Sequence, residues 1–396
     1  MGLPKAKFEL EFSHGSSYGE EEKAAVLQVL EQNAPSCGVK VQEFEQEFAK
    51  YCGVEYGLAV SSATAGLSLA LIAAGVGPGD DVITTPISWI STANAATALG
   101  ARVIFADVDH CTLNLDPKSV ARKITDRTKV ILPVHLYGQC CDMDALNALA
   151  SPRGILVVED AAHAAGAEYK GRKAGALGDI GVFSFHQQKN MVTLGEGGMI
   201  TTRSRTLFEN MLSHRSLCCR TYDPKGKYLA IDEIAQPMGK RYWHLEFDGI
   251  GFNYRMTEIQ AAVGLVQLRK LDSLNARRIE IAKRYSNGLR GIKGLGLPCL
   301  FPDSKHVFHV YRLLLGSEFR LNKEDFMWKL YTQKQIKAWS HYMPIHLTTI
   351  YRSLGHGEGE CPVAEAMFER YVSLPIHPRM TEESVDYVIQ SIRELA

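Results

Sequence analysis

The chain has 396 residues, 46% of them hydrophobic, so it can bury a large core and is long enough for two or three domains. Its 44 basic residues balance 44 acidic residues, which excludes a global field that would attract nucleic acid or an anionic membrane. The start, "MGLPKAKFELEF", lacks a long apolar segment, and no stretch approaches the roughly 18 apolar residues of a membrane span. We therefore expect a globular, cytoplasmic protein with no nucleic-acid or membrane partner.

The 9 cysteines are scattered and include two adjacent pairs, Cys140–Cys141 and Cys218–Cys219, which do not easily form ordinary disulfides. No C-x-x-C pair is present, so the sequence offers no cysteine zinc site. We expect reduced thiols and no bound metal.

Between residues 55 and 205, short β-rich runs alternate with Ala/Leu-rich helical runs. Runs such as "KVILPVHL" and "ILVVED" are continuously apolar, which is typical of strands covered on both faces. The pattern predicts an α/β unit with a largely parallel sheet. The predicted strands are residues 56–60, 81–86, 101–108, 128–136, 154–160, 181–185 and 198–202.

Residues 257–290 have helical periodicity and few breakers, which predicts one long connecting helix or two. After it, strand-like "HVYRLLL" and helical "KEDFMWKLYTQKQ" and "ESVDYVIQSIREL" predict a smaller α+β domain. We expect a large domain over residues 1–255 and a connecting helix with a small domain over 256–396. Residues 218–249 are polar, aromatic and punctuated by Gly and Pro, so we expect a long excursion near a site or an interface.

The stretch "VFSFHQQKNMVTLGEGGMITT" places Lys189 after a short apolar strand and three glycines soon after it. A lysine near a sheet edge can have its pKa lowered by desolvation and act as a nucleophile toward a carbonyl group. The alternative is an ordinary surface lysine. The glycines allow backbone conformations closed to other residues and the close approach of a ligand. They are not a Walker-type loop, since "TLGEGGMI" lacks the G-x-x-x-x-G-K-[ST] spacing.

Asp160 closes the apolar strand "ILVVED", where a carboxylate has little water around it and needs a cationic partner. The alternative is the N-cap of a following helix. Ligands of open α/β sheets bind at the carboxyl ends of the strands, which favours a functional role for Asp160.

In "VSSATAGLSLAL", a strand is followed by small polar residues that open a helix. The first N–H groups of a helix are unpaired, so the turn at Ser62, Ala63 and Thr64 can bind a phosphate. An N-cap without a ligand is the alternative. No G-x-G-x-x-G follows a strand, which counts against a dinucleotide.

Together these features describe an anion site at a helix start, a buried aspartate for a protonated ring nitrogen and a lysine able to form a Schiff base. Pyridoxal phosphate requires those three parts. Trp89, in "TTPISWISTANA", offers an aromatic face for the ring, with a core tryptophan as the alternative.

With these residues in place, the chain resembles the DegT/DnrJ/EryC1/StrS family of pyridoxal-phosphate-dependent sugar aminotransferases, which have the aspartate-aminotransferase fold (fold type I). The resemblance covers roughly residues 15 to 390 and includes "SSATAGLSLAL", "PISWISTANA", "PVHLYGQCCDMDAL", "VVEDAAHAAGA", "FSFHQQKNMVTLGEGGMITT", "GFNYRMTEIQAAVGLVQL" and "HYMPIHLTTIYR". It implies that Lys189 forms the Schiff base, Asp160 binds the pyridine nitrogen and Trp89 stacks on the ring. It also implies that His163 lies near the phenolic oxygen of the ring.

The resemblance further implies that Ala63, Thr64 and Ser184 hold the phosphate. Asn253, in "GFNYRM", would reach the phosphate from the other subunit, so the resemblance implies a homodimer with shared sites. The implied substrate-binding residues are His341 and Tyr342.

The implied reaction is ping-pong transfer of an amino group from glutamate or glutamine to a keto group on a nucleotide-linked sugar or a cyclitol. One branch of the family has histidine in place of the Schiff-base lysine and acts as a dehydratase, whereas this chain has Lys189. The alternatives are a dehydratase or lyase that uses the same lysine, and a non-catalytic protein that binds the cofactor.

Overall fold

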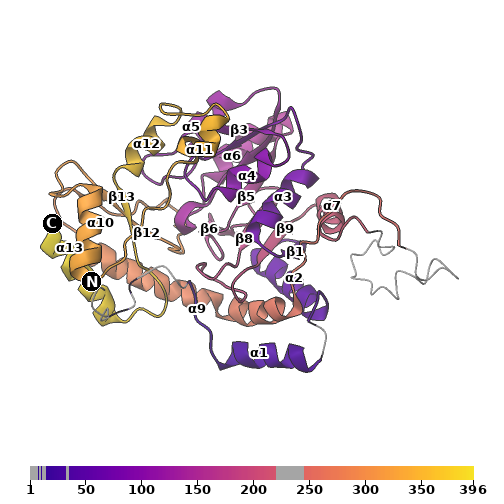
Figure 1. The fold of residues 1–396 in the computed structure, drawn as a ribbon, viewed down its shortest axis with the longest axis horizontal. Helices are drawn as coiled ribbons and strands as arrows, with labels where there is room; N and C mark the ends of the chain where they lie inside the picture. The colour runs from indigo at the N-terminus through magenta and orange to yellow at the C-terminus, as the bar shows by residue number, and fades with distance from the viewer. Residues whose placement is uncertain (1–7, 9, 11–14, 33–34, 220–244) are drawn as a thin grey trace.

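The computed structural model describes residues 8, 10, 15–32, 35–219 and 245–396. Its centre is a 7-stranded sheet in the order β1-β9-β8-β5-β4-β2-β3 (Figure 1). Strand β9 is antiparallel to both β1 and β8, and the other neighbouring pairs are parallel. These are the seven predicted strands, so the α/β class with a mostly parallel sheet is confirmed. Their bounds are β1 (Tyr56–Val60), β2 (Asp81–Thr84), β3 (Arg102–Phe105), β4 (Thr128–Leu132), β5 (Leu156–Asp160), β8 (Ile180–Ser184) and β9 (Gly198–Thr202).

Both faces of this sheet are buried, which explains the continuously apolar strands. In β4, Val130 and Leu132 belong to one core cluster and Ile131 belongs to the other, because successive side chains point to opposite faces. Helices from both sides complete the two clusters. The helices of this region are α2 (Val39–Cys52), α3 (Ala63–Ala73), α4 (Ser91–Thr97), α5 (Pro117–Lys123), α6 (Met143–Ala150) and α7 (Arg205–Arg215).

The predicted connecting helix is a single helix, α9 (Glu258–Leu289), of 32 residues and so about 48 Å long. It begins with a capping box formed by Thr257 and Gln260. In Figure 1 it runs beneath the sheet from the region of α2 to the C-terminal helices, with α1 (Glu20–Glu31) along its outer side. Helix α1 is tied to α9 by Glu22, which accepts a hydrogen bond from Gln267 at 2.8 Å and pairs with Lys270 at 3.0 Å.

The far end of α9 packs into a third core cluster around a 3-stranded antiparallel sheet in the order β10-β12-β13. Leu10 joins this cluster, whereas Ile345 and Tyr351 belong to the core of the large sheet. The chain therefore crosses between the two regions, and the domain boundary at residue 255 stays a prediction. The C-terminal elements are β10 (Leu295–Gly296), β12 (Tyr311–Leu315), α10 (Lys323–Lys334), α11 (Thr349–Ser353), α12 (Pro362–Phe368), β13 (Tyr371–Leu374) and α13 (Glu382–Leu395).

A further small sheet joins the two regions, in the order β11-β6-β7. Its strands are β6 (Glu168–Tyr169), β7 (Arg172–Lys173) and β11 (Ser304–Lys305).

Of the predicted excursion over 218–249, residues 220–244 lie outside the described residues. Among the described residues, no helix is both long and apolar enough to cross a membrane.

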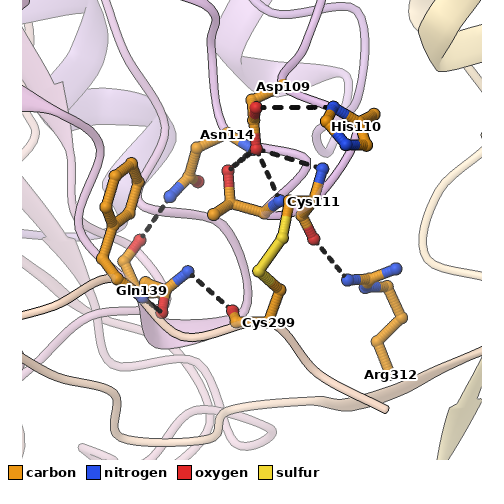
Figure 2. Close-up of a disulfide and its surroundings, with 9 residues drawn as sticks. Asp109, His110, Cys111, Asn114, Gln139, Cys299 and Arg312 are labelled. Atoms are coloured by element: carbon orange, nitrogen blue, oxygen red, sulfur yellow. Dashed lines mark hydrogen bonds and ion pairs between the residues drawn. A yellow bond between two sulfur atoms is a disulfide. The ribbon is translucent and has the colours of Figure 1, made fainter. Parts of the chain in front are cut away.

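The expectation that all cysteines are reduced is wrong for one pair. Cys111 and Cys299 form a disulfide (Figure 2). The other seven cysteines are free thiols. These two cysteines lie 188 residues apart in the chain, so no local spacing in the sequence predicted that they would form a disulfide. Neighbouring bonds hold both backbones: Arg312 donates to the Cys111 carbonyl at 2.8 Å and Gln139 to the Cys299 carbonyl at 3.2 Å (Figure 2).

Candidate active site

A cavity of about 690 Å³ opens at the edge of the sheet where β5 and β8 end, and residues of the C-terminal region close its other side. Strands β5 and β8 are parallel, with Asp160 paired to Val182, so their carboxyl ends meet at one edge. Nearly all of the predicted site residues line this cavity. They are Ala63, Thr64, Trp89, Asp160, His163, Ser184, Lys189, His341 and Tyr342.

Lys189 lies in a turn after β8 rather than on the strand itself, since β8 ends at Ser184 and the Lys189 N–H donates to the His186 carbonyl at 2.8 Å. The neighbouring Asn190 is buried and fixes this turn, because its amide donates to Asn275 on α9 at 2.9 Å and to the Val307 carbonyl at 3.0 Å. Desolvation lowers the pKa of Lys189 to about 8, an effect that the charge of Asp160 opposes. Lys189 is also half-buried and lines the cavity, which argues against an ordinary surface lysine.

Two of the glycines after Lys189 have separate roles. Gly195 has φ of +105°, a conformation that residues with a Cβ rarely adopt. Gly198 begins β9, where a Cβ would lie 2.7 Å from the Ser62 carbonyl carbon and 2.8 Å from the Ala63 nitrogen. The backbone at the start of α3 therefore lies close to Gly198. It can reach the edge of the sheet because Gly198 has no side chain.

That beginning of α3 faces the cavity. The Ser62 hydroxyl caps the helix by accepting from the Ala65 N–H at 3.2 Å, while Ala63 and Thr64 line the cavity. The first N–H groups of a helix have no partner within it and attract an anion. Ser62 is thus an N-cap, and Ala63, Thr64 and the buried Ser184 surround a position suited to a phosphate.

Asp160 is buried and is held from two sides. Its carboxylate accepts from the Thr92 hydroxyl at 2.7 Å and from the Ala162 N–H at 3.1 Å. Residues 161–167 form turns, so Asp160 does not cap a helix, contrary to the structural alternative. Burial raises the pKa of Asp160, and the bond from Thr92 is the largest effect that opposes the rise. A carboxylate in this position gains from a cationic group placed in the cavity.

His163 lies between two rings on the same side of the cavity. Its ring contacts that of His309 with centroids 4.3 Å apart, and its Nε2 lies 3.3 Å from the Tyr342 hydroxyl. Burial lowers the pKa of both histidines well below the usual value, so both are neutral at physiological pH. Among the described residues, neither Nδ1 has a hydrogen-bond partner. His163 therefore presents a neutral imidazole to the cavity.

Trp89 is 62% exposed, which excludes the core-tryptophan alternative, and its ring meets that of Tyr342 edge to face with centroids 6.0 Å apart. Backbone bonds hold the segment at His341 and Tyr342: Tyr137 donates to the His341 carbonyl and Tyr371 to the Tyr342 carbonyl. Burial lowers the pKa of His341 to about 3, so this imidazole is neutral as well.

Asn253 is the one predicted site residue that this cavity does not include. It is exposed and pairs with Ser216 through an isolated antiparallel bridge. Its expected role in the cofactor site of a second subunit stays a prediction.

Sequence reasoning missed several residues that act here. Thr92 lies in the motif "TTPISWISTANA", close to Trp89, but its position in the sequence does not predict a contact with Asp160. His309 is distant from His163 in the sequence, and the two rings come into contact only in the folded chain. Lys337 and Trp339 line the cavity, and their alternation with the buried Ile336 and Ala338 was a signal that could have been used.

The residues present fit pyridoxal 5'-phosphate. The pKa of the Lys189 amine is lowered to about 8, the carboxylate of Asp160 is buried, and the start of α3 offers N–H groups to the cavity beside Gly198. An aldehyde, a ring nitrogen that binds a proton and a phosphate are the complementary groups of this cofactor.

The chain matches the profile of the DegT/DnrJ/EryC1/StrS aminotransferase family over residues 16–393. The spore coat polysaccharide biosynthesis protein SpsC of Bacillus subtilis is 39% identical over 384 residues, 95% of each chain. GDP-perosamine synthase of Caulobacter vibrioides is 38% identical over 361 residues, 91% of each chain. DesV of S. venezuelae, a solved structure, has 35% identity and a TM-score of 0.84, with 95% of this chain and 94% of that chain covered.

The match therefore spans both the sheet that carries Lys189 and the C-terminal region that closes the cavity. This chain belongs to the DegT/DnrJ/EryC1/StrS aminotransferase family and is an aminotransferase that uses pyridoxal 5'-phosphate.

Proposed function

We propose that this enzyme transfers an amino group from glutamate or glutamine to a keto group on a nucleotide-linked sugar or a cyclitol, by a ping-pong mechanism. The observation that carries the proposal is the presence of Lys189, with a pKa of about 8, in the same cavity as the buried Asp160. GDP-perosamine synthase, at 38% identity, supports a nucleotide-linked acceptor.

When bound, pyridoxal 5'-phosphate supplies an electrophilic carbonyl carbon and a ring that accepts electrons. Lys189 Nζ would hold the cofactor until the amino group of the donor takes its place. Once free, Lys189 Nζ would take a proton from the α-carbon of the donor and return it to the carbon of the cofactor that keeps the amino group. In the second half of the reaction, the same nitrogen would move a proton in the reverse direction, to the carbon of the acceptor that receives the amino group. A pKa near the working pH suits a group that both accepts and returns a proton.

Asp160 would hold a proton on the ring nitrogen through its carboxylate, and Thr92 keeps that carboxylate oriented with its 2.7 Å hydrogen bond. Ala63, Thr64 and Ser184 would hold the phosphate, and Trp89 would offer its ring to the cofactor. His163, which is neutral and in contact with His309, lines the cavity without adding a charge that would compete with Asp160.

The discriminating experiment separates the two half-reactions. The holoenzyme is mixed with glutamate or glutamine, and we expect loss of the visible absorbance of the lysine-bound cofactor together with one equivalent of keto acid per site. The aminated enzyme is then offered keto-sugar nucleotides and keto-cyclitols, and recovery of the absorbance identifies the acceptor. Loss of water from the sugar without stoichiometric keto acid supports a dehydratase, and the absence of any donor-dependent change supports a non-catalytic protein.

Lys189→Ala is expected to abolish both the visible absorbance and turnover, and Lys189→Arg should fail as well, since a guanidinium is not a useful nucleophile at neutral pH. Lys118→Ala is the matched control, because Lys118 is exposed on α5 and does not line the cavity. Normal turnover of Lys189→Ala without an added amine would overturn the proposal.

We further infer a homodimer with shared sites, supported by the exposure of Asn253 outside the cavity of its own chain.

The cytoplasmic location expected from the sequence stays a prediction. The disulfide between Cys111 and Cys299 makes a direct test worthwhile, because such bonds are rare in reducing compartments.

A further inference from the structure

Arg278 on α9 is a buried arginine whose hydrogen-bond acceptors are backbone carbonyl groups. Its guanidinium donates to the carbonyl of Phe308 at 3.1 Å, to that of Ile376 at 2.9 Å and to that of Gly15. Burial lowers the pKa of Arg278 to about 9, so the side chain stays charged at neutral pH. A buried charge is costly, and here it joins three segments that lie far apart in the chain.

One of these segments packs directly against the turn that carries Lys189. The Gly15 N–H donates to the Gln187 carbonyl at 2.8 Å. A Cβ on Gly15 would lie 1.9 Å from the Lys189 carbonyl oxygen and 2.2 Å from the Gln188 carbonyl carbon. Only a glycine allows this approach, so Gly15 links the guanidinium of Arg278 to the backbone of the turn.

The same face of α9 holds this turn at a second point. Asn275 accepts a hydrogen bond from the Asn190 amide at 2.9 Å, and Asn275 and Arg278 are three residues apart, so they lie on one face of the helix. The Gln187 N–H donates to the Gly195 carbonyl at 2.9 Å on the other strand of the turn. Helix α9 therefore fixes the turn directly through Asn275 and indirectly through Arg278.

The bond from Arg278 to Phe308 supports another part of the cavity wall. The residue after Phe308 is His309, whose ring contacts that of His163. Burial lowers the pKa of His309 well below its usual value, and the charge of Arg278 is among those that add to this effect. One guanidinium thus supports the backbone behind Lys189 and the backbone that carries His309, and both Lys189 and His163 line the cavity.

We propose that Arg278 is a positioning residue for Lys189 and His163. It acts through two backbone carbonyls, that of Gly15 for the lysine turn and that of Phe308 for the histidines. Reacting groups must be held closely in place, and a misplacement of about 1 Å can cost about a hundredfold in rate. The inference rests on the proposed role of Lys189, but it does not depend on which donor or acceptor the enzyme uses.

The test compares two probes on cofactor-free enzyme. Stopped-flow absorbance gives the rate at which Lys189 captures pyridoxal 5'-phosphate, whereas pyridoxamine 5'-phosphate has no aldehyde, so its affinity reports the cavity without Lys189. Arg278→Met removes the donors and keeps the length of the side chain. We expect it to slow capture by about tenfold to a hundredfold and to leave pyridoxamine 5'-phosphate affinity unchanged. Arg278→Lys should give an intermediate rate, because its donors lie on one nitrogen.

Gly15→Ala tests the same link from its other end, because it keeps Arg278 and places a Cβ against the Lys189 carbonyl. It should slow capture and leave pyridoxamine 5'-phosphate affinity unchanged. The matched controls are Gly77→Ala, whose Cβ meets nothing within 4 Å, and Arg269→Met at an exposed position of α9. All rates are measured well below the lowest melting temperature, so that slow capture does not reflect unfolded protein.

Equal capture rates of Arg278→Met and wild type would overturn the inference. A parallel loss of pyridoxamine 5'-phosphate binding in a folded variant would also overturn it, since Arg278 would then support the cavity as a whole. If Arg278→Met does not fold, Gly15→Ala decides, and capture as fast as in Gly77→Ala overturns the inference.

Lys189→Ala separates this inference from the proposed function. If Lys189→Ala develops the same visible absorbance as the wild type, the proposed role of Lys189 fails and the inference fails with it. If Lys189→Ala loses the absorbance while Arg278→Met captures the cofactor normally, only the inference fails.

Discussion

Lys189 and Asp160 carry opposite charges when ionised and lie in one cavity. Burial nevertheless shifts the pKa of each side chain so that its neutral form is favoured. Desolvation lowers the pKa of Lys189 to about 8 and raises that of Asp160. Their mutual attraction opposes both shifts without cancelling them. A bound ring that takes the Lys189 nitrogen into a covalent bond and gives Asp160 a cationic partner thus relieves two desolvation costs at once.

The pKa of Lys189 sets the pH dependence of cofactor capture, because only the neutral amine attacks the aldehyde. The rate at which cofactor-free enzyme captures pyridoxal 5'-phosphate should rise about tenfold per pH unit below the pKa and level off above pH of about 8. Stopped-flow absorbance between pH 6 and 10 measures this rate. An ordinary lysine titrates near pH 10.4, so a rate that still rises tenfold between pH 9 and 10 contradicts the shifted pKa.

Asp160→Asn removes the charge that holds the ring proton but keeps the shape of the side chain. We expect kcat to fall by about two orders of magnitude or more, the range for loss of one electrostatic group in an active site, while the cofactor still binds. Thr92→Val, which removes the bond to Asp160, should cause a smaller loss, and Asp126→Asn at an exposed position should cause none. Wild-type activity of Asp160→Asn would leave Asp160 a purely structural residue.

At the level of elements, the site depends on how closely α3 meets β9. The Ser62–Ala63 backbone lies against Gly198, and the turn of Lys189 is pinned to α9 through Asn190 and Asn275. The phosphate position and the lysine are thus set by contacts between elements far apart in the chain. Helix α9 contributes to both the large sheet and the C-terminal core, so a change in its packing reaches both sides of the cavity.

Gly198→Ala tests this arrangement, since its Cβ would lie within 2.9 Å of three backbone atoms that cannot move independently. We expect an unfolding free energy lower by about 1–3 kcal/mol and weaker cofactor binding, because α3 must shift from the sheet edge. Thermal unfolding and cofactor titration measure the two effects. Gly77→Ala is the control, because its Cβ meets nothing within 4 Å, and equal behaviour of the two variants would count against the close contact.

On the scale of the whole molecule, one covalent bond joins distant parts of the chain. The disulfide between Cys111 and Cys299 ties the loop after β3 to the segment before β11, across the boundary between the sheet and the C-terminal region. Asn253 is proposed to act across an interface between two chains.

Protein purified without reductant should show 7 titratable thiols per denatured chain, and 9 after reduction. The double variant Cys111→Ser/Cys299→Ser should unfold more readily, by up to about 5 kcal/mol in the chain-entropy model for a 188-residue separation. Cys37→Ser should leave one thiol fewer with the disulfide intact. Nine thiols before reduction would show that the bond does not form.

The shared site is tested with a mixed dimer. If Asn253 acts across the interface, Asn253→Asp should place a carboxylate against the phosphate in the partner's site, whereas Lys189→Ala should disable the site of its own chain. Each parent homodimer should be nearly inactive, whereas a heterodimer purified with two tags should recover up to about half the wild-type rate per dimer, since one of its two sites is whole. No recovery in a verified heterodimer would show that Asn253 does not act across the interface.

Local patterns in the sequence were enough for the strands, the long helix and the main residues of the site. Continuous apolar runs imply strands covered on both faces, and the carboxyl ends of parallel strands meet at one edge, so Asp160 and the residues after β8 were placed together correctly. Gly195 and Gly198 were recognisable as special, although only the structure shows that protein backbone approaches Gly198.

Tertiary structure alone decided the partners that come from far along the chain. His309 lies behind His163, Asn275 anchors the turn of Lys189, Lys337 and Trp339 enter the cavity, and Cys111 meets Cys299. Hydrophobic periodicity and capping are short-range signals, set by the geometry of single helices and strands. Which side chains meet across elements depends instead on how α9 and the C-terminal region pack against the sheet, and no spacing within one segment contains that information.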